Sequence, residues 1–187
     1  MPLPRWLVSN SSSLLYAFLL GLLPLFFSST VTYYAIRYEP HVRNFDTPAW
    51  VGFYVLSSLT MAFALTPTTF IALLSGYFLG WLSILPVSVS YLAASWIGYR
   101  AAQRLDGGRF MRNLPRKERA EKLVSNLKNN EFGLIVMARL SPVLPFAVTN
   151  VLLSLSGASL RTFLTAGFIG MLPRTMLSIW VGSQARQ

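Results

Sequence analysis

Residues 138–150 read Ala-Arg-Leu-Ser-Pro-Val-Leu-Pro-Phe-Ala-Val-Thr-Asn, and this stretch decides how the rest of the chain is interpreted. It places an arginine, two prolines and an asparagine in an apolar run, and residues 140–160 carry no charge. Each proline removes one backbone donor and frees a carbonyl one turn earlier. Within a bilayer, such a break persists only where it is buried in protein or lines a wet cavity. Because a charge at membrane depth marks a functional site, the stretch predicts a broken, re-entrant element that handles an anionic ligand.

The composition is that of a membrane protein. Of the 187 residues, 53% are hydrophobic and 12% are charged, and the mean hydropathy is +0.50. A soluble domain carries about 25% charged residues. The net charge of +10 could indicate nucleic acid, but the basic residues flank apolar runs, as the positive-inside rule describes. We therefore expect a polytopic, all-α membrane protein with no nucleic-acid partner. The chain has no cysteine, which excludes disulfides and thiolate chemistry.

Residues 1–46 are predicted to form an N-terminal transmembrane helix and a loop. Residues 6–36 carry no charge, which is long enough for one span. The alternative is a cleaved signal peptide, with Arg5 as its basic region and residues 14–27 as its apolar core. No small-residue cleavage motif follows, and the apolar character continues through residues 31–36, which favours a retained span.

Residues 47–187 are predicted to form the main membrane domain. Residues 47–99 carry no charge and are interrupted by Pro67, beside threonines whose hydroxyls can satisfy freed backbone groups. Gly76 and Gly80 form a G-x-x-x-G pattern that allows close helix approach. This pattern indicates either a tightly packed re-entrant hairpin or ordinary helix packing.

Residues 100–131 are predicted to be a polar connector on the cytoplasmic side. They hold nine Lys or Arg residues against four acids, which is the bias of cytoplasmic loops. Within them, residues 120, 123, 124 and 127 are apolar and share one face of a helix. This amphipathic helix would lie either on an anionic membrane surface or on the protein's own cytoplasmic face.

The order of these segments predicts an inverted repeat. A hairpin over roughly residues 50–80 and a span over roughly 83–99 would connect an outer loop at 37–46 to the cytoplasmic connector. A second hairpin over 132–160 and a span over 162–182 would then enter from the opposite side. Sites in such repeats lie where the broken elements meet near the bilayer midplane.

Two groups of residues resemble the DedA superfamily, also called the VTT-domain or SNARE-associated Golgi protein family. The second half of the chain carries Arg139, Pro142, Pro145, Phe146, Asn150, Ser159, Phe163, Gly170 and Pro173, and the first half carries Pro67, Gly76, Gly80, Gly98, Tyr99 and Arg100. The resemblance covers residues 60–182. It implies two opposed re-entrant hairpins, a role in scrambling lipids or recycling undecaprenyl phosphate, and a location in the bacterial cytoplasmic membrane.

The chain also departs from that family. No acid lies near the first hairpin, where many members carry acids associated with proton coupling. Ser154 replaces a common glycine, and Arg174 stands where a small residue is usual. These differences put ion coupling in doubt and leave the expected fold unchanged.

An enzymatic function is not expected. The predicted spans contain no carboxylate, and the sole histidine, His41, lies in a loop, so a serine–histidine pair has no base. No metal-ligand cluster appears, and neither a metal nor a cofactor is predicted.

The predicted binding site centres on Arg139. Its guanidinium would supply a charged fork for a phosphate, and the helix after Pro145 would add its N-terminal donors. Asn150 would satisfy the backbone opened by Pro142 and Pro145. The opposing hairpin would contribute Pro67, Thr68, Gly76 and Gly80. The alternative for Arg139 is an interfacial residue that snorkels to any lipid headgroup.

The leading functional hypothesis is movement of a phosphate-bearing lipid, such as undecaprenyl phosphate or a phospholipid, between leaflets. The expected partners are membrane lipids that are anionic or carry a phosphate, and a homo-oligomer is left open. The alternatives are a transporter of a small ion or solute, or a membrane-organising scaffold that transports nothing.

Overall fold

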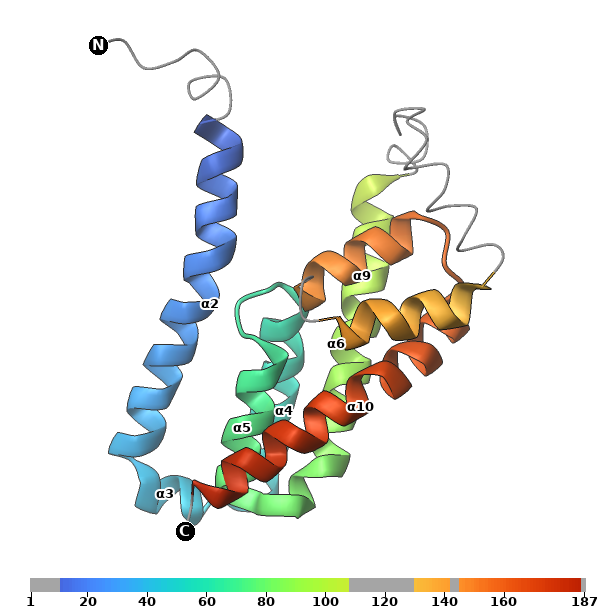
Figure 1. The fold of residues 1–187 in the computed structure, drawn as a ribbon. Coiled ribbons are helices and arrows are strands. Elements are labelled where there is room, and N and C mark those ends of the chain that lie inside the picture. The colour runs from blue at the N-terminus through green and yellow to red at the C-terminus, as the bar shows by residue number, and fades with distance from the viewer. Residues whose placement is uncertain (1–10, 108–129, 142–144, 186–187) are drawn as a thin grey trace, which may run out of the picture.

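The computed structural model describes residues 11–107, 130–141 and 145–185, and these ranges contain helices and no strand. Helix α2 (Ser11–Arg37) stands beside the other helices and leads into the short helix α3 (Glu39–Arg43) (Figure 1). Its 27 residues correspond to about 40 Å, enough for a bilayer crossing. The structure thus has a helix over the predicted N-terminal span, and its crossing of a membrane stays a prediction.

Helices α4 (Thr47–Ala62) and α5 (Thr68–Leu79) are each too short to cross a bilayer. With 16 and 12 residues they reach about 24 and 18 Å, against a hydrocarbon core of about 30 Å. At the turn between them the hydroxyls of Thr60 and Thr66 lie 2.8 Å apart, and the Leu65 N–H bonds the Thr60 carbonyl at 2.8 Å. Local partners thus satisfy backbone groups near the break that Pro67 introduces.

Long helices follow each half-length segment. After the 3-10 turn η1 (Gly80–Ser83), α6 (Ile84–Asp106) runs antiparallel to α5 (Figure 1). A helix over residues 130–140 then leads, across the prolines, to the 10-residue α9 (Phe146–Leu155) and to α10 (Leu160–Gln184). The side chain of Ser159 caps α10 by accepting from the Thr162 N–H, and the Glu131 carboxylate accepts from the Ser159 N–H. These bonds tie the start of α10 to the start of the 130–140 helix.

The helices pack in a crossed pattern. Helix α5 packs on α10, whereas α9 and α4 pack on α6. A methyl group at Gly76 would collide with the backbone of Ile179, and one at Gly182 would collide with the backbone of Leu73, so α5 and α10 are in backbone contact. One core cluster contains Met61, Ile71, Val87, Tyr91, Met171 and Ile179, and a second contains Tyr99, Ile135, Leu153, Phe163 and Ala166.

The structure gives the two glycines of the G-x-x-x-G pattern different roles. Gly76 makes the close approach that the pattern predicts. Gly80 does not pack: a side chain there would meet nothing within 4 Å, and its φ of +57° ends α5 in a conformation that L residues rarely adopt. The expected tight packing therefore applies to Gly76 and is wrong for Gly80.

Two helical stretches in the described ranges, Thr68–Asp106 and Leu160–Gln184, are long and apolar enough to contain a membrane span. They include the two predicted spans, which the structure extends to 84–106 and 160–184. The predicted amphipathic helix around residues 120–127 lies outside the described residues.

Candidate functional site

Arg139 lies inside the protein, at the end of the 130–140 helix. Its side chain is 4% exposed, and its Nη2 donates to Asn150 Oδ1 at 2.6 Å. Nη1 lies 3.5 Å from the Phe146 carbonyl oxygen, which makes this a weak hydrogen bond. Nε has no hydrogen-bond partner among the described residues. The guanidinium therefore has unused donor capacity, although it is enclosed.

Asn150 has a different partner from the one expected. It is fully buried in the middle of α9, where its side-chain oxygen accepts from the guanidinium of Arg139, and it bonds no backbone group among the described residues beside the proline break. Two other side chains reach this backbone: the Thr149 hydroxyl donates to the Pro145 carbonyl at 3.1 Å, and Arg139 Nη1 lies 3.5 Å from the Phe146 carbonyl oxygen. The Nδ2 amide of Asn150 has no partner in the described part of the chain.

Aromatic rings and glycines enclose this pair. The guanidinium carbon of Arg139 lies 4.7 Å from the ring centroid of Phe146 and 5.2 Å from that of Phe163, within cation–π range. A methyl group at Gly98 would lie 2.8 Å from Asn150 Nδ2, and one at Gly170 would lie 2.8 Å from Arg139 Cβ. Only glycine at these positions of α6 and α10 leaves room for both polar side chains.

The first hairpin carries a second polar contact at the start of α5. Pro67 is the N-cap of α5 in an extended conformation, as Pro145 is for α9, and neither helix has a side-chain cap. The buried Thr68 accepts from Arg174 Nη2 of α10 at 2.9 Å through its hydroxyl, and its carbonyl accepts from the Tyr91 hydroxyl of α6. The start of α5 is thus bound to both long helices.

Tyr91 connects the two hairpins. Besides its bond to Thr68, its ring lies 6.5 Å from that of Phe146, and Phe146 packs against the core cluster that includes Met61 at the end of α4. Tyr91 therefore joins the starts of α5 and α9 in the interior.

The charge around this meeting point is entirely positive. Residues 47–105 and 132–187 contain no Asp or Glu, so neither Arg139 nor Arg174 has a carboxylate on these segments. Sequence reasoning included Arg139 in the site but omitted Arg174 and Tyr91. Arg174 carried a usable signal, because a charge inside a predicted span marks a functional site.

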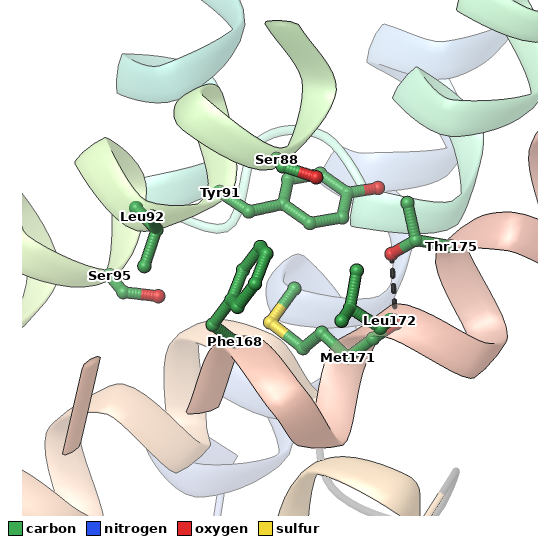
Figure 2. Close-up of a pocket in the computed structure, with 8 residues that line it drawn as sticks. All are labelled: Ser88, Tyr91, Leu92, Ser95, Phe168, Met171, Leu172 and Thr175. Carbon is green, nitrogen blue, oxygen red and sulfur yellow. Dashed lines mark hydrogen bonds between the residues drawn. The ribbon is translucent and has the colours of Figure 1, made fainter. Parts of the chain in front are cut away.

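A small cavity lies between α6 and α10 beside Tyr91. Its volume of about 10 Å³ is close to the room that one water molecule needs. Figure 2 shows the Tyr91 ring, Phe168 and Met171 between the two helices, with the hydroxyl of Thr175 bonded to the Met171 carbonyl. This interface is packed and holds no chamber for a solute.

The other predicted site residues lie in different places. Pro67, Thr68, Pro145 and Asn150 gather around the meeting of the hairpins, as described above. Gly76 packs against Ile179 farther along α5, and Gly80 lies in the turn after it, so neither belongs to this cluster. Pro142 lies outside the described residues. Within the ranges 11–107, 130–141 and 145–185, no group of three or more His, Cys, Asp or Glu side chains could hold a metal ion.

Comparisons with known proteins agree with this architecture. Residues 66–184 match the VTT domain. A curated relative, the Transmembrane protein 41 homolog of Dictyostelium discoideum, is 29% identical over 147 residues, which cover 71% of this chain and 40% of the relative. The match thus spans less than half of that protein's length. No solved structure matches the chain. The VTT match runs from the start of α5 to the end of α10 and includes the starts of both α5 and α9, so this chain belongs to the VTT-domain (DedA/SNARE-associated) family of integral membrane proteins.

Proposed function

We propose that this protein moves a phosphate-bearing lipid between the two leaflets of its membrane. The observation that carries the proposal is the positive centre where the hairpins meet. Arg139 is 4% exposed and Arg174 is half-buried, and both lie on segments that contain no carboxylate. A buried charge is costly unless it is paired. An anionic headgroup would provide the charge that the protein itself omits.

The donors of Arg139 fit this role. Its contact with the Phe146 carbonyl is long, and its Nε is unpaired among the described residues. A phosphate could therefore gain two strong, charge-assisted bonds from the fork at the expense of one weak bond. The N-terminal N–H groups of α9, which has no side-chain cap, would add donors to the same phosphate. In the structure Arg139 Nη2 also bonds Asn150 Oδ1, which orients the guanidinium.

The inverted repeat would give the site access from both leaflets. We pair α4, α5 and α6 with the 130–140 helix, α9 and α10. Each unit is a hairpin of short helices followed by a long helix, and the short helices α5 and α9 pack on the long helix of the other unit. Rocking one unit against the other would expose the fixed arginines alternately to the two leaflets.

Beside Tyr91, where the two hairpins are joined, a lipid headgroup fits better than a soluble solute does. The cavity between α6 and α10 holds about one water molecule. Solute pockets usually enclose about 300–1,000 Å³. A lipid needs only a polar track for its headgroup, since its chains can remain in the bilayer. A scaffold that transports nothing does not require two arginines that lack carboxylate partners in the interior.

Replacement of Arg139 tests the proposal. Arg139→Lys keeps the charge but loses the bidentate fork, and we expect lipid movement in liposomes to fall about tenfold, because one hydrogen bond to a charged group is worth about 1.5–3 kcal/mol. Movement is measured by reduction of a fluorescent phospholipid that reaches the outer leaflet. Arg161→Gln, at an exposed position near the start of α10, is the matched control and should leave the rate unchanged. Full activity of Arg139→Lys would rule out the phosphate fork.

The proposed topology places residues 100–131 in the cytoplasm and residues 37–46 on the other side. Because the chain has no cysteine, single cysteines report this directly. An impermeant thiol reagent on intact cells should label His41→Cys and should not label Ser125→Cys. The reverse pattern would invert the arrangement. The bacterial cytoplasmic membrane stays a prediction, because the relative described above comes from a eukaryote.

A further inference from the structure

A second apolar feature lies far from Arg139, between α2 and the pair α5 and α10. It is a groove of about 450 Å³, a size common among pockets for small ligands. Its lining is almost entirely apolar and includes Ile36, Leu73, Leu74, Phe78 and Val181. Nothing in the transport proposal uses this groove.

The wall contributed by α2 is one face of that helix. Thr32, Ala35 and Ile36 are spaced so that they project from the same side. In Figure 1, α2 stands beside the rest of the bundle and approaches it at the α3 end. The wall opposite is the pair α5 and α10, whose backbones touch at Gly76 and Gly182. Two apolar walls therefore face each other without filling the space between them.

A polar cluster marks one end of the groove. Tyr77 lines the groove, and its hydroxyl donates to Glu39 Oε1 at 2.7 Å. Arg43 bonds the same oxygen through Nε and Nη2, at 2.9 and 2.5 Å, and its guanidinium carbon lies 5.7 Å from the Tyr77 ring centroid. A guanidinium has five N–H donors, so donors of Arg43 remain for an anion. Arg37, at the end of α2, is exposed nearby in the sequence.

We propose that this groove is a binding site for a resident phospholipid, with an acyl chain between α2 and α5/α10 and the headgroup phosphate at the Glu39–Arg43–Tyr77 cluster. The apolar lining matches the chain, and the donors of Arg43 that its ion pair with Glu39 does not use match the phosphate. Because proteins of this family lie in a membrane, lipid chains also surround the groove on both sides. The site is separate from the Arg139 centre, so the proposal stands whether or not the protein transports lipid.

The test uses the full chain reconstituted in vesicles of phosphatidylcholine and phosphatidylglycerol that contain a phospholipid with a photoactivatable acyl chain. Mass spectrometry then maps the labelled residues. Label should concentrate on Phe70 and Leu74, which line the groove and are half-buried, compared with Val55, a 58% exposed residue of α4. After detergent exchange, native mass spectrometry should still detect one phospholipid bound to the protein. Equal labelling of groove and exposed surface, or no retained phospholipid, would overturn the proposal.

Variants that fill the groove provide the second arm. Ala35→Trp on one wall and Leu74→Trp on the other should each lose the retained phospholipid, whereas Val55→Trp on the exposed face should keep it. Two variants on different helices guard against a folding defect in one, and each must elute as a single species. Retention of phospholipid by both filled variants would place the lipid elsewhere. Formation of a disulfide-linked dimer by Leu74→Cys would contradict the proposal by showing that a second copy of the chain occupies the groove.

Discussion

Asn150→Asp separates a structural role of Arg139 from a phosphate-binding role, because it is nearly isosteric and changes only charge. In the structure, the neutral amide oxygen accepts from Arg139 Nη2 at 2.6 Å, while the amide nitrogen has no partner among the described residues. An aspartate would pair the guanidinium inside the protein and would remove that unpaired donor. The protein would then carry its own counter-charge, and a phosphate would have to compete with it.

The two expected effects have opposite signs. At 2.6 Å the new charge pair attracts by roughly 6 kcal/mol with an effective dielectric constant of about 20, less several kcal/mol for burying the carboxylate. A net gain of about 1–3 kcal/mol follows, which is also the usual range for hydrogen bonds to charged groups. For a chain of this size it raises Tm by roughly 2–10 °C. Lipid movement should fall about tenfold or more, because the phosphate loses interactions of similar strength.

Both effects are measured on the same preparations, by thermal unfolding in detergent and by the fluorescent-phospholipid assay in liposomes. Asn44→Asp adds the same charge in an exposed loop and serves as the matched control. A stable Asn150→Asp protein with the wild-type rate of lipid movement would refute the reasoning, since the charge of Arg139 would then be dispensable. Loss of both stability and movement would show that the carboxylate is not accommodated, which contradicts the calculated gain.

Two further predictions concern packing and the α3 contact. Gly98→Ala should destabilise the protein by about 1–3 kcal/mol in thermal unfolding, because its methyl group would lie 2.8 Å from Asn150 Nδ2. Gly52→Ala, where a methyl group meets nothing within 4 Å on an exposed helix face, should instead stabilise it by about 0.4–1 kcal/mol. The Tyr77 hydroxyl and then Arg43 lower the pKa of Glu39 below 4.5, so the contact between α3 and α5 contributes fully above pH 4.5 and is lost as the pH falls through the lowered value. Tyr77→Phe should raise the pKa of Glu39, as measured from its side-chain carboxyl resonance by NMR, and an unchanged pKa would contradict the role of Tyr77.

The prolines and the charge distribution predicted most of the fold. The two prolines at the breaks each precede a short helix, because a proline cannot donate within the helix before it and has a φ suited to the start of the next one. Pro67 and Pro145 do this at the starts of α5 and α9. Uncharged runs predicted the long helices, with ends that differ by a few residues because capping by Ser159 and Gly107 sets them.

Tertiary contacts could not be predicted in the same way. The partner of Asn150 depends on where the end of the 130–140 helix falls relative to α9, and its spacing from Arg139 in sequence does not reveal this. The opposite roles of Gly76 and Gly80 depend on the register of α5 against α10 and on the φ of the turn. Tyr91 resembles any aromatic residue of an apolar helix until its hydroxyl is seen to reach the Thr68 carbonyl.

The central claim is that Arg139 binds the phosphate of a lipid, and solid-state NMR can measure this contact directly. The protein is labelled with 15N on arginine side chains, reconstituted in phospholipid vesicles, and examined for dipolar coupling between lipid 31P and guanidinium nitrogen. Arg139→Gln identifies the signal of this residue. We predict a coupling to Arg139 that corresponds to direct hydrogen bonding, with nitrogen and phosphate oxygen about 2.7–2.9 Å apart. A preparation that moves lipid but shows no coupling between 31P and Arg139 would contradict the proposal.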